Sequence, residues 1–135
     1  MAFDGTVTFV LAATSGIGSA LGRRIRAAGG TVIPAGRNRE KLAAIAAELG
    51  EAGIEFDAAS FDSVESAVQQ AASRYGRLDG VALCSGSLLL KPAHLTTEAE
   101  YRATMAANID AAFAAVRAAA KAMMNTGGSI VLVSS

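Results

Sequence analysis

A short glycine-rich segment near the N-terminus could bind phosphate through its backbone. The segment is Thr14-Ser15-Gly16-Ile17-Gly18, and it lies between an apolar run and a stretch with helical periodicity. Gly16 would let a pyrophosphate approach the main chain closely, and Gly18 would let the helix pack tightly on the strand. The two hydroxyl groups and the free N–H groups of a helix N-terminus would add donors. A plain tight turn is the alternative, whereas a P-loop is excluded because no Gly-Lys-Ser/Thr follows.

A basic segment, Arg37-Asn38-Arg39 with Lys41 close behind, follows the next apolar run. Dinucleotide-binding folds place their ribose selector about 20 residues past the glycines, where an acidic side chain binds the 2′-hydroxyl of NAD. This sequence has Arg37 there, and a guanidinium suits the 2′-phosphate of NADP. A solvated helix start would explain the same charges, so the residues alone leave both interpretations open.

The elements that must position these residues alternate between strand and helix. Apolar runs predict strands at residues 6–12, 31–35, 53–57, 78–84 and 129–133. Helices are predicted at 16–28, 38–50, from 62 or 63 onward and from 96 or 97 to 124. Their predicted N-terminal caps are Asn38, then Asp62 or Ser63, then Thr96 or Thr97, and Glu100 would complete a capping box with Thr97. Such strand–helix–strand repeats form parallel sheets with right-handed crossovers. Pro34 cannot donate to a ladder, so we expect it on an edge strand or near the C-terminal end of its strand.

Composition and charge exclude several classes of protein. The 135 residues are 52% hydrophobic and 18% charged with a net charge of +0, which indicates one globular domain and no basic field for nucleic acid or an anionic membrane. Cys84 is the single cysteine, and neither a signal peptide nor a membrane-spanning run is visible, so a cytoplasmic location is expected. His94 has no cysteine or carboxylate cluster beside it, so no metal site is expected.

In order and spacing, motifs along the whole chain resemble those of the short-chain dehydrogenase/reductase family. They are the turn at residues 14–18, Gly36-Arg37, Asp57, Leu78-Asp79 leading to Gly86, Asn108 in a long helix, and residues 128–135. The resemblance implies an α/β, Rossmann-type, doubly wound parallel sheet in three layers, with strand order 3-2-1-4-5, truncated after the fifth strand. It implies an NADP(H)-dependent oxidoreductase acting on a small carbonyl or alcohol substrate, with residues 1–135 as its cofactor-binding part.

The resemblance also implies roles for single residues. Gly16, Ile17 and Gly18 would cradle the pyrophosphate beside Thr14 and Ser15. Arg37 would favour NADP(H) over NAD(H), Asp57 would contact the adenine, and Gly86 would admit the nicotinamide ribose; a surface carboxylate is the alternative for Asp57. Asn108 would organise a proton relay, and Ser135 would hydrogen-bond the substrate carbonyl. The helix over 106–124 would form a homo-oligomer interface, although it must also pack on its own sheet.

Three departures from the family pattern weigh against a complete enzyme. Ala12 stands where the family has its first glycine, and Leu83-Cys84-Ser85-Gly86 replaces Asn-Asn-Ala-Gly. The family's Tyr-x-x-x-Lys pair lies beyond Ser135, so we expect these residues to be a piece of a longer enzyme that is inactive alone, because carbonyl reduction needs a positioned acid. The alternative hypothesis is a non-catalytic nucleotide-binding or interaction module.

Overall fold

Five parallel strands form one sheet in the order β3-β2-β1-β4-β5 in a computed structural model, which describes residues 1–134. The strands are β1 (Val7–Leu11), β2 (Thr31–Gly36), β3 (Ile54–Glu55), β4 (Gly80–Leu83) and β5 (Ser129–Leu132). The main helices are α1 (Gly16–Ala27), α2 (Arg39–Leu49), α3 (Phe61–Tyr75), α4 (Glu98–Met105) and α5 (Ala111–Met123). The predicted fold class and strand order are confirmed.

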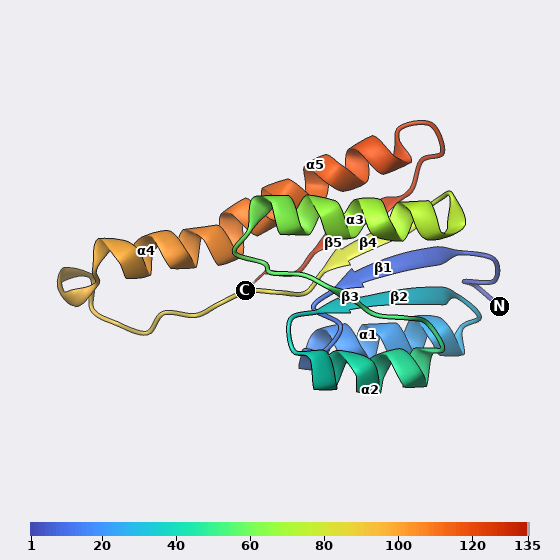
Figure 1. Cartoon of the computed structure of the whole chain (residues 1–135), viewed down its shortest axis with the longest axis horizontal. Coiled ribbons are helices and arrows are strands. Elements are labelled where there is room, and N and C mark those ends of the chain that lie inside the picture. The colour runs from blue at the N-terminus through green and yellow to red at the C-terminus, as the bar shows by residue number, and fades with distance from the viewer. Residues whose placement is uncertain (135) are drawn as a thin grey trace.

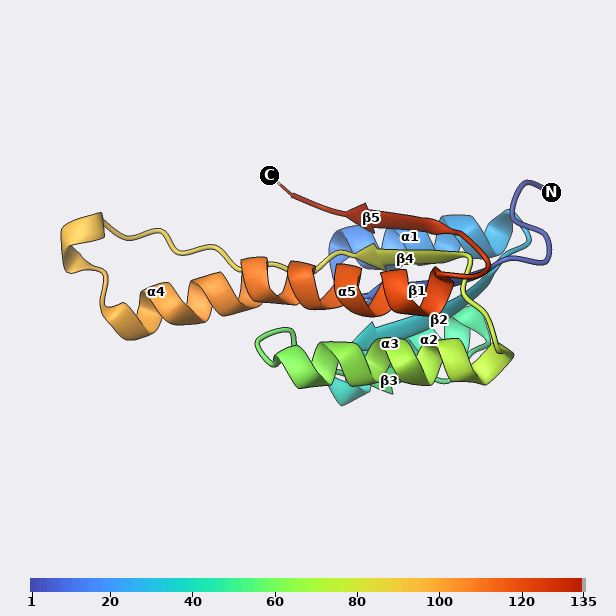
Figure 2. The same ribbon diagram turned by 90° about the horizontal axis from the view of Figure 1, so that it is seen from above.

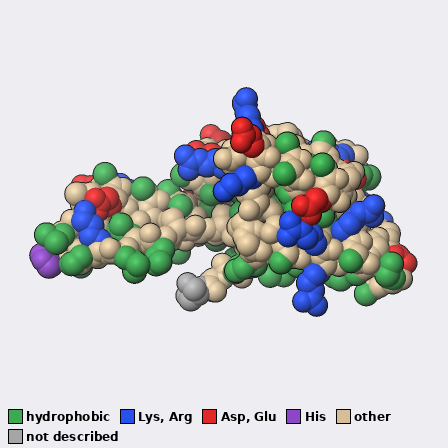
Figure 3. All heavy atoms as spheres, turned by 90° about the horizontal axis from the view of Figure 1, so that it is seen from below, with side chains coloured by type: hydrophobic (Ala, Val, Ile, Leu, Met, Phe, Trp, Pro, Cys, Tyr) green, Lys and Arg blue, Asp and Glu red, His purple; other side chains and the backbone are tan. Residues whose placement is uncertain are grey.

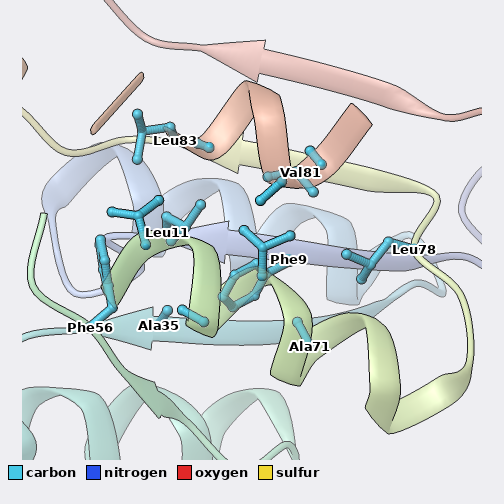
Figure 4. Close-up of a cluster of buried hydrophobic side chains, with 14 of the residues drawn as sticks. Phe9, Leu11, Ala35, Phe56, Ala71, Leu78, Val81 and Leu83 are labelled. Atoms are coloured by element: carbon cyan, nitrogen blue, oxygen red, sulfur yellow. The ribbon is translucent and has the colours of Figure 1, made fainter. Parts of the chain in front are cut away.

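Helices cover both faces of the sheet. α1 and α2 lie on one face, and α3 and α5 lie on the other (Figure 1). The larger core lies under α3 and α5, where the side chains of Phe9, Leu11 and Val81 point from the strands toward the helices (Figure 4). Alanines supply the facing surface of α5, with Ala114, Ala115 and Ala119 buried in that core. Small side chains let a helix approach its own sheet closely, so this face of α5 packs within the chain.

Several predicted boundaries change in the structure. Four strands are shorter than predicted at one or both ends, with β3 reduced to Ile54–Glu55 and β4 to Gly80–Leu83, whereas β2 extends one residue further, to Gly36. Backbone ladders end where the neighbouring strand no longer offers partners, which a run of apolar residues does not reveal. The N-cap of α3 is Ser60, whose hydroxyl accepts from the N–H of Ser63 at 3.2 Å, so the prediction of Asp62 or Ser63 is wrong.

Pro34 lies inside β2, between β1 and β3, and not on an edge strand. Within β2, Thr31 and Ala35 hydrogen-bond to the β1 side, whereas Gly36 accepts from Phe56 on the β3 side. Backbone groups alternate between the two sides of a strand, so the nitrogen of Pro34 faces β3. β3 pairs with β2 only from Ala35 onward, so no ladder bond is lost at the proline.

The predicted helix over 97–124 is divided by a π-helical turn. α4 begins at a capping box in which Thr97 and Glu100 satisfy each other's backbone N–H groups, as predicted. The turn η2 (Ala106–Asp110) then joins α4 to α5. The loop after β4 and α4 project well beyond the sheet as an arm, defined here as residues 87–105 (Figure 2). The arm exposes the apolar side chains of Leu88, Leu90 and Leu95. Hydrophobic side chains gather near its end, beside the single histidine (Figure 3).

Candidate functional site

A cavity of about 240 Å³ lies where the carboxyl ends of the first four strands meet. Its walls include four of the predicted cofactor-binding residues, namely Thr14, Arg37, Asp57 and Gly86. β1 lies between β2 and β4. β2 and β3 are added on one side of β1 and β4 and β5 on the other, so the strand order reverses at this point. Ligands of open α/β sheets bind at such a topological switch point. The structure therefore brings four separate sequence motifs to one pocket.

The glycine turn opens α1 as the sequence predicts. A Cβ atom at Gly18 would lie 2.0 Å from the carbonyl oxygen of Ala12, so only glycine lets the helix approach β1 this closely. A Cβ at Gly16 would meet nothing within 4 Å, because Gly16 faces open space. Within the described residues no hydrogen bond uses the N–H of Gly16 or Ile17. Two donors of the helix N-terminus thus stay available for an anion.

Ser15 acts as the N-cap of α1. Its hydroxyl oxygen accepts from the N–H of Gly18 at 3.0 Å, and its hydroxyl donates to the carbonyl of Ala12 at 2.8 Å. A hydroxyl has one hydrogen to donate. In this arrangement Ser15 fixes the turn, and the donation to phosphate would come from the backbone and Thr14.

Ala12 adopts the left-handed conformation, with φ of 64°. It is the one non-glycine residue with a positive φ among residues 1–134. L-residues are disfavoured in this region because Cβ approaches the following carbonyl. Glycine, which the family has at this position, would adopt this backbone conformation without strain. With alanine instead, the turn keeps its conformation and the backbone of Ala12 is strained.

Arg37 and Asp57 are the charged residues that line the cavity among the described residues. Arg37 lines the cavity directly, while Arg39 forms an ion pair with Glu55 at the end of β3. Asn38 between them caps α2, accepting from the N–H of Lys41 at 3.0 Å, as predicted. The cap fixes the point where β2 gives way to α2, and Arg37 therefore remains at the cavity.

Asp57 organises the turn between β3 and α3. Its carboxylate accepts from the N–H of Ala59 at 3.0 Å, and its own N–H donates to the hydroxyl of Ser63 at 2.8 Å. The residue follows β3 by two positions and lines the cavity beside Phe56. An Asx-type turn holds the carboxylate at the wall, where it can also accept from a ligand.

Ser85 is a cavity residue that sequence reasoning did not assign to the site. It lines the pocket beside Gly86, and its hydroxyl is buried without a partner among the described residues. A buried hydroxyl left unsatisfied destabilises a protein by about 1–3 kcal/mol. Its place directly after β4 was the available signal, since residues after parallel strands form such sites.

Asn108 lies in the π turn and connects it to the loop after β4. Its Oδ1 accepts from the N–H of Ser87 at 3.1 Å, and its Nδ2 donates to the carbonyls of Ser87 at 3.1 Å and Thr104 at 2.8 Å. A Cβ at Gly86 would lie 3.0 Å from the same Oδ1. Asn108 thereby holds the segment that closes one side of the cavity. Ser135 lies outside the described residues.

Other reactive groups give no second site. Burial raises the pKa of the Cys84 thiol, which keeps it protonated and poorly nucleophilic. The described residues contain no group of three or more His, Cys, Asp or Glu side chains that could hold a metal ion. Within residues 1–134 there is also no helix with the length and apolarity required to cross a membrane.

Residues 6–135 match the family model described as short chain dehydrogenase, and the chain belongs to this family of dehydrogenases and reductases. It is 34% identical over 140 residues to a 3β-hydroxysteroid dehydrogenase of Mediterraneibacter gnavus, which covers 98% of this chain and 50% of that protein. It is 31% identical over 134 residues to a D-threitol dehydrogenase of Mycolicibacterium smegmatis, covering 96% of this chain and 52% of that protein.

Solved structures show the same relationship. A short-chain type dehydrogenase/reductase from Mycobacterium ulcerans superposes with a TM-score of 0.92 at 29% identity, covering 98% of this chain and 52% of that one. A blue fluorescent protein from a metagenomic library, solved in complex with NADPH, gives a TM-score of 0.89 at 32% identity, covering 98% and 56%. The chain spans about half the length of the curated relatives that it matches.

Proposed function

We propose that this chain is the cofactor-binding part of an NADP(H)-dependent oxidoreductase that interconverts a carbonyl and an alcohol on a small molecule. One observation carries the proposal: Arg37, Asp57 and Thr14, the first residue of the glycine turn, line a single cavity on the carboxyl edge of the sheet. Nicotinamide cofactors supply hydride for such reactions, and the protein supplies binding and orientation.

The residues present fit such a cofactor on three grounds. The N–H groups of Gly16 and Ile17 are available to a pyrophosphate, and Gly16 leaves open space in front of them. The guanidinium of Arg37 would attract a ribose 2′-phosphate, and Asp57 would accept from the adenine amino group. The hydroxyl of Ser85, which has no partner among the described residues, could hydrogen-bond to a polar group of the ligand.

Two further residues would serve the substrate side of the reaction. Asn108 would act as a positioning residue, because its side chain fixes Ser87 and the loop beside the cavity. Ser135 would donate a hydrogen bond to the substrate carbonyl. Neither group supplies the acid that carbonyl reduction needs, and Tyr75 and Tyr101 have no lysine four residues on. The proton donor of the proposed reaction would therefore lie in the half of the relatives that this chain does not span.

We also propose that the parent enzyme is a homo-oligomer through the helix at residues 106–124. Ile109 and Phe113 support this, because both are more than half exposed on the outer side while the alanines of α5 face the sheet. Exposed large apolar side chains in a row favour association with another apolar surface.

Isothermal titration calorimetry with NADPH and NADH tests the cofactor proposal. We expect NADPH to bind more tightly, and Arg37→Ala to weaken NADPH binding about tenfold while leaving NADH nearly unchanged. Arg24→Ala, at an exposed arginine near the C-terminal end of α1, is the matched control. If a chain shown to be folded bound neither nucleotide, the proposal would fail and an interaction module would become the better hypothesis.

A further inference from the structure

The ion pair between Arg39 and Glu55 joins two chain segments that each also supply a residue to the cavity. Arg39 is the first residue of α2, two positions after the cavity residue Arg37. Glu55 is the last residue of β3 and is followed by Phe56 and Asp57, which both line the cavity. β2 and β3 place Gly36 opposite Glu55, so the two chain segments that carry the pair are adjacent in the sheet.

The charges at this rim cancel. Arg37 and Arg39 contribute two positive charges, and Glu55 and Asp57 contribute two negative ones. A 2′-phosphate carries up to two negative charges and needs a positive surplus to be preferred over a hydroxyl. Glu55 removes that surplus in two ways, because it repels the phosphate and occupies Arg39.

The pair is held weakly enough to exchange partners. The side chain of Arg39 is 86% exposed and that of Glu55 is 47% exposed, so both ends contact solvent. Exposed ion pairs of this kind are weak and screened by salt. A bound phosphate would therefore compete with Glu55 for the same guanidinium.

Resting on the proposed function, we infer that Glu55 limits the selectivity of this site for a 2′-phosphorylated nucleotide by holding Arg39 and opposing the phosphate charge. Arg37 supplies the basal preference, and Arg39 is a second phosphate ligand that is restrained by its partner. Removing the carboxylate charge of Glu55 frees Arg39 and increases the preference for the phosphate. The relevant ligand chemistry is the 2′-phosphate itself, independent of the nicotinamide ring.

Adenosine 2′,5′-bisphosphate and adenosine 5′-monophosphate are suitable probes, since they differ only in that phosphate. We expect Glu55→Gln to raise the ratio of their affinities about 3- to 10-fold, measured by calorimetric titration at low salt. The gain should shrink as salt is added. Arg39→Gln should abolish the gain in the Glu55→Gln background and have a smaller effect on the ratio in the wild-type background.

Glu48→Gln is the matched control, because Glu48 forms a similarly exposed ion pair with Arg23 at 2.7 Å near the other end of α2. An unchanged ratio in Glu55→Gln, or an equal change in Glu48→Gln, would overturn the inference even though both probes still bind. Failure of the folded wild-type chain to bind either probe would overturn the proposed function, and this inference with it. The two failures are therefore distinguishable.

Discussion

Strain at Ala12 is a residue-scale feature that changes the stability of the fold. Ala12 has φ of 64°, and its carbonyl accepts from Ser15 at the start of α1. Ala12→Gly removes the steric conflict but gives the unfolded chain more freedom. We expect a net gain of about 0.5–1 kcal/mol in the free energy of unfolding, measured by urea denaturation.

Ala13→Gly provides the control for this substitution. Ala13 is buried, and its backbone has no positive φ. Glycine there should lower the free energy of unfolding, because it adds entropy to the unfolded state and leaves a small void. A destabilised Ala12→Gly variant would show that the methyl group of Ala12 contributes more by packing than the backbone loses by strain.

Asp79 joins two strands through a carboxylate. Burial raises its pKa, but the hydrogen bond from the N–H of Val7 at 2.8 Å and the guanidinium of Arg77 at 2.8 Å outweigh burial, so its pKa is lowered. The stabilisation is therefore present above the unfolded pKa of about 4 and is lost as pH falls through the lower folded pKa. We expect Asp79→Asn to lose about 1–2 kcal/mol at pH 7 and to match the wild type below that folded pKa.

Unfolding curves collected across pH check this expectation. Asp110→Asn, at an exposed aspartate in the π turn, should show little difference from the wild type at any pH. A deficit of Asp79→Asn that persisted at acidic pH would mean that the charge of Asp79 is not what stabilises the strand pair.

Residue-scale features divide into those that the sequence predicts and those that it does not. The caps at Asn38 and Thr97 were predictable, because each depends on residues three positions apart. The unsatisfied hydroxyl of Ser85 was not predictable, because it depends on which groups the fold places around it. The hydrogen bond from Val7 to Asp79 was not predictable either, because the two residues are 72 positions apart. Hydrogen bonds between residues near in the chain can be predicted from a sequence, whereas those between distant residues cannot.

At the scale of elements, the π turn depends on Asn108. Its side chain bonds to Thr104 within the helix and to Ser87 in the loop, so it ties α4 and α5 to the end of β4. We expect Asn108→Ala to reduce the free energy of unfolding by about 2 kcal/mol, because four polar groups of Ser87 and Thr104 lose their partner. Amide hydrogen exchange should rise for residues 85–90.

Asn125→Ala is a matched control, because Asn125 is exposed in the turn after α5. If exchange of the loop rose equally in both variants, Asn108 would not be the residue that holds it. Hydrophobic periodicity could not predict this turn, since the apolar pattern continues from α4 into α5 and a π turn shifts it by only one residue.

At the scale of the whole molecule, the outer side of the 106–124 helix is the proposed contact between copies. Ile109 is 56% exposed, and Phe113 remains 61% exposed although its ring lies 6.0 Å from that of Phe61 in α3. Ile109→Glu with Phe113→Glu should shift the protein toward monomer, because burying two carboxylates at an interface is unfavourable. Sedimentation velocity measures the change.

Lys121→Glu serves as the control for charge on the same helix, since Lys121 is also exposed on α5. Unchanged sedimentation of the double variant would locate the interface elsewhere. The layered fold and the strand order were predictable from alternating strands and helices together with the family motifs. The projection of the arm at residues 87–105 was not, because hydrophobic periodicity does not give the direction of a helix relative to the sheet.

The central position of β1 has a consequence for how the chain acquires its structure. One side of β1 pairs with β2, which follows directly after α1. The other side pairs with β4, which comes much later in the chain. The hydrogen bond between Val7 and Asp79 joins residues 72 positions apart. Pairing β1 with β4 therefore requires the closure of a long loop. During synthesis the ribosome releases β1 well before β4. In that interval the second edge of β1 is an open template for other chains, and the time to docking of β4 sets the risk of aggregation.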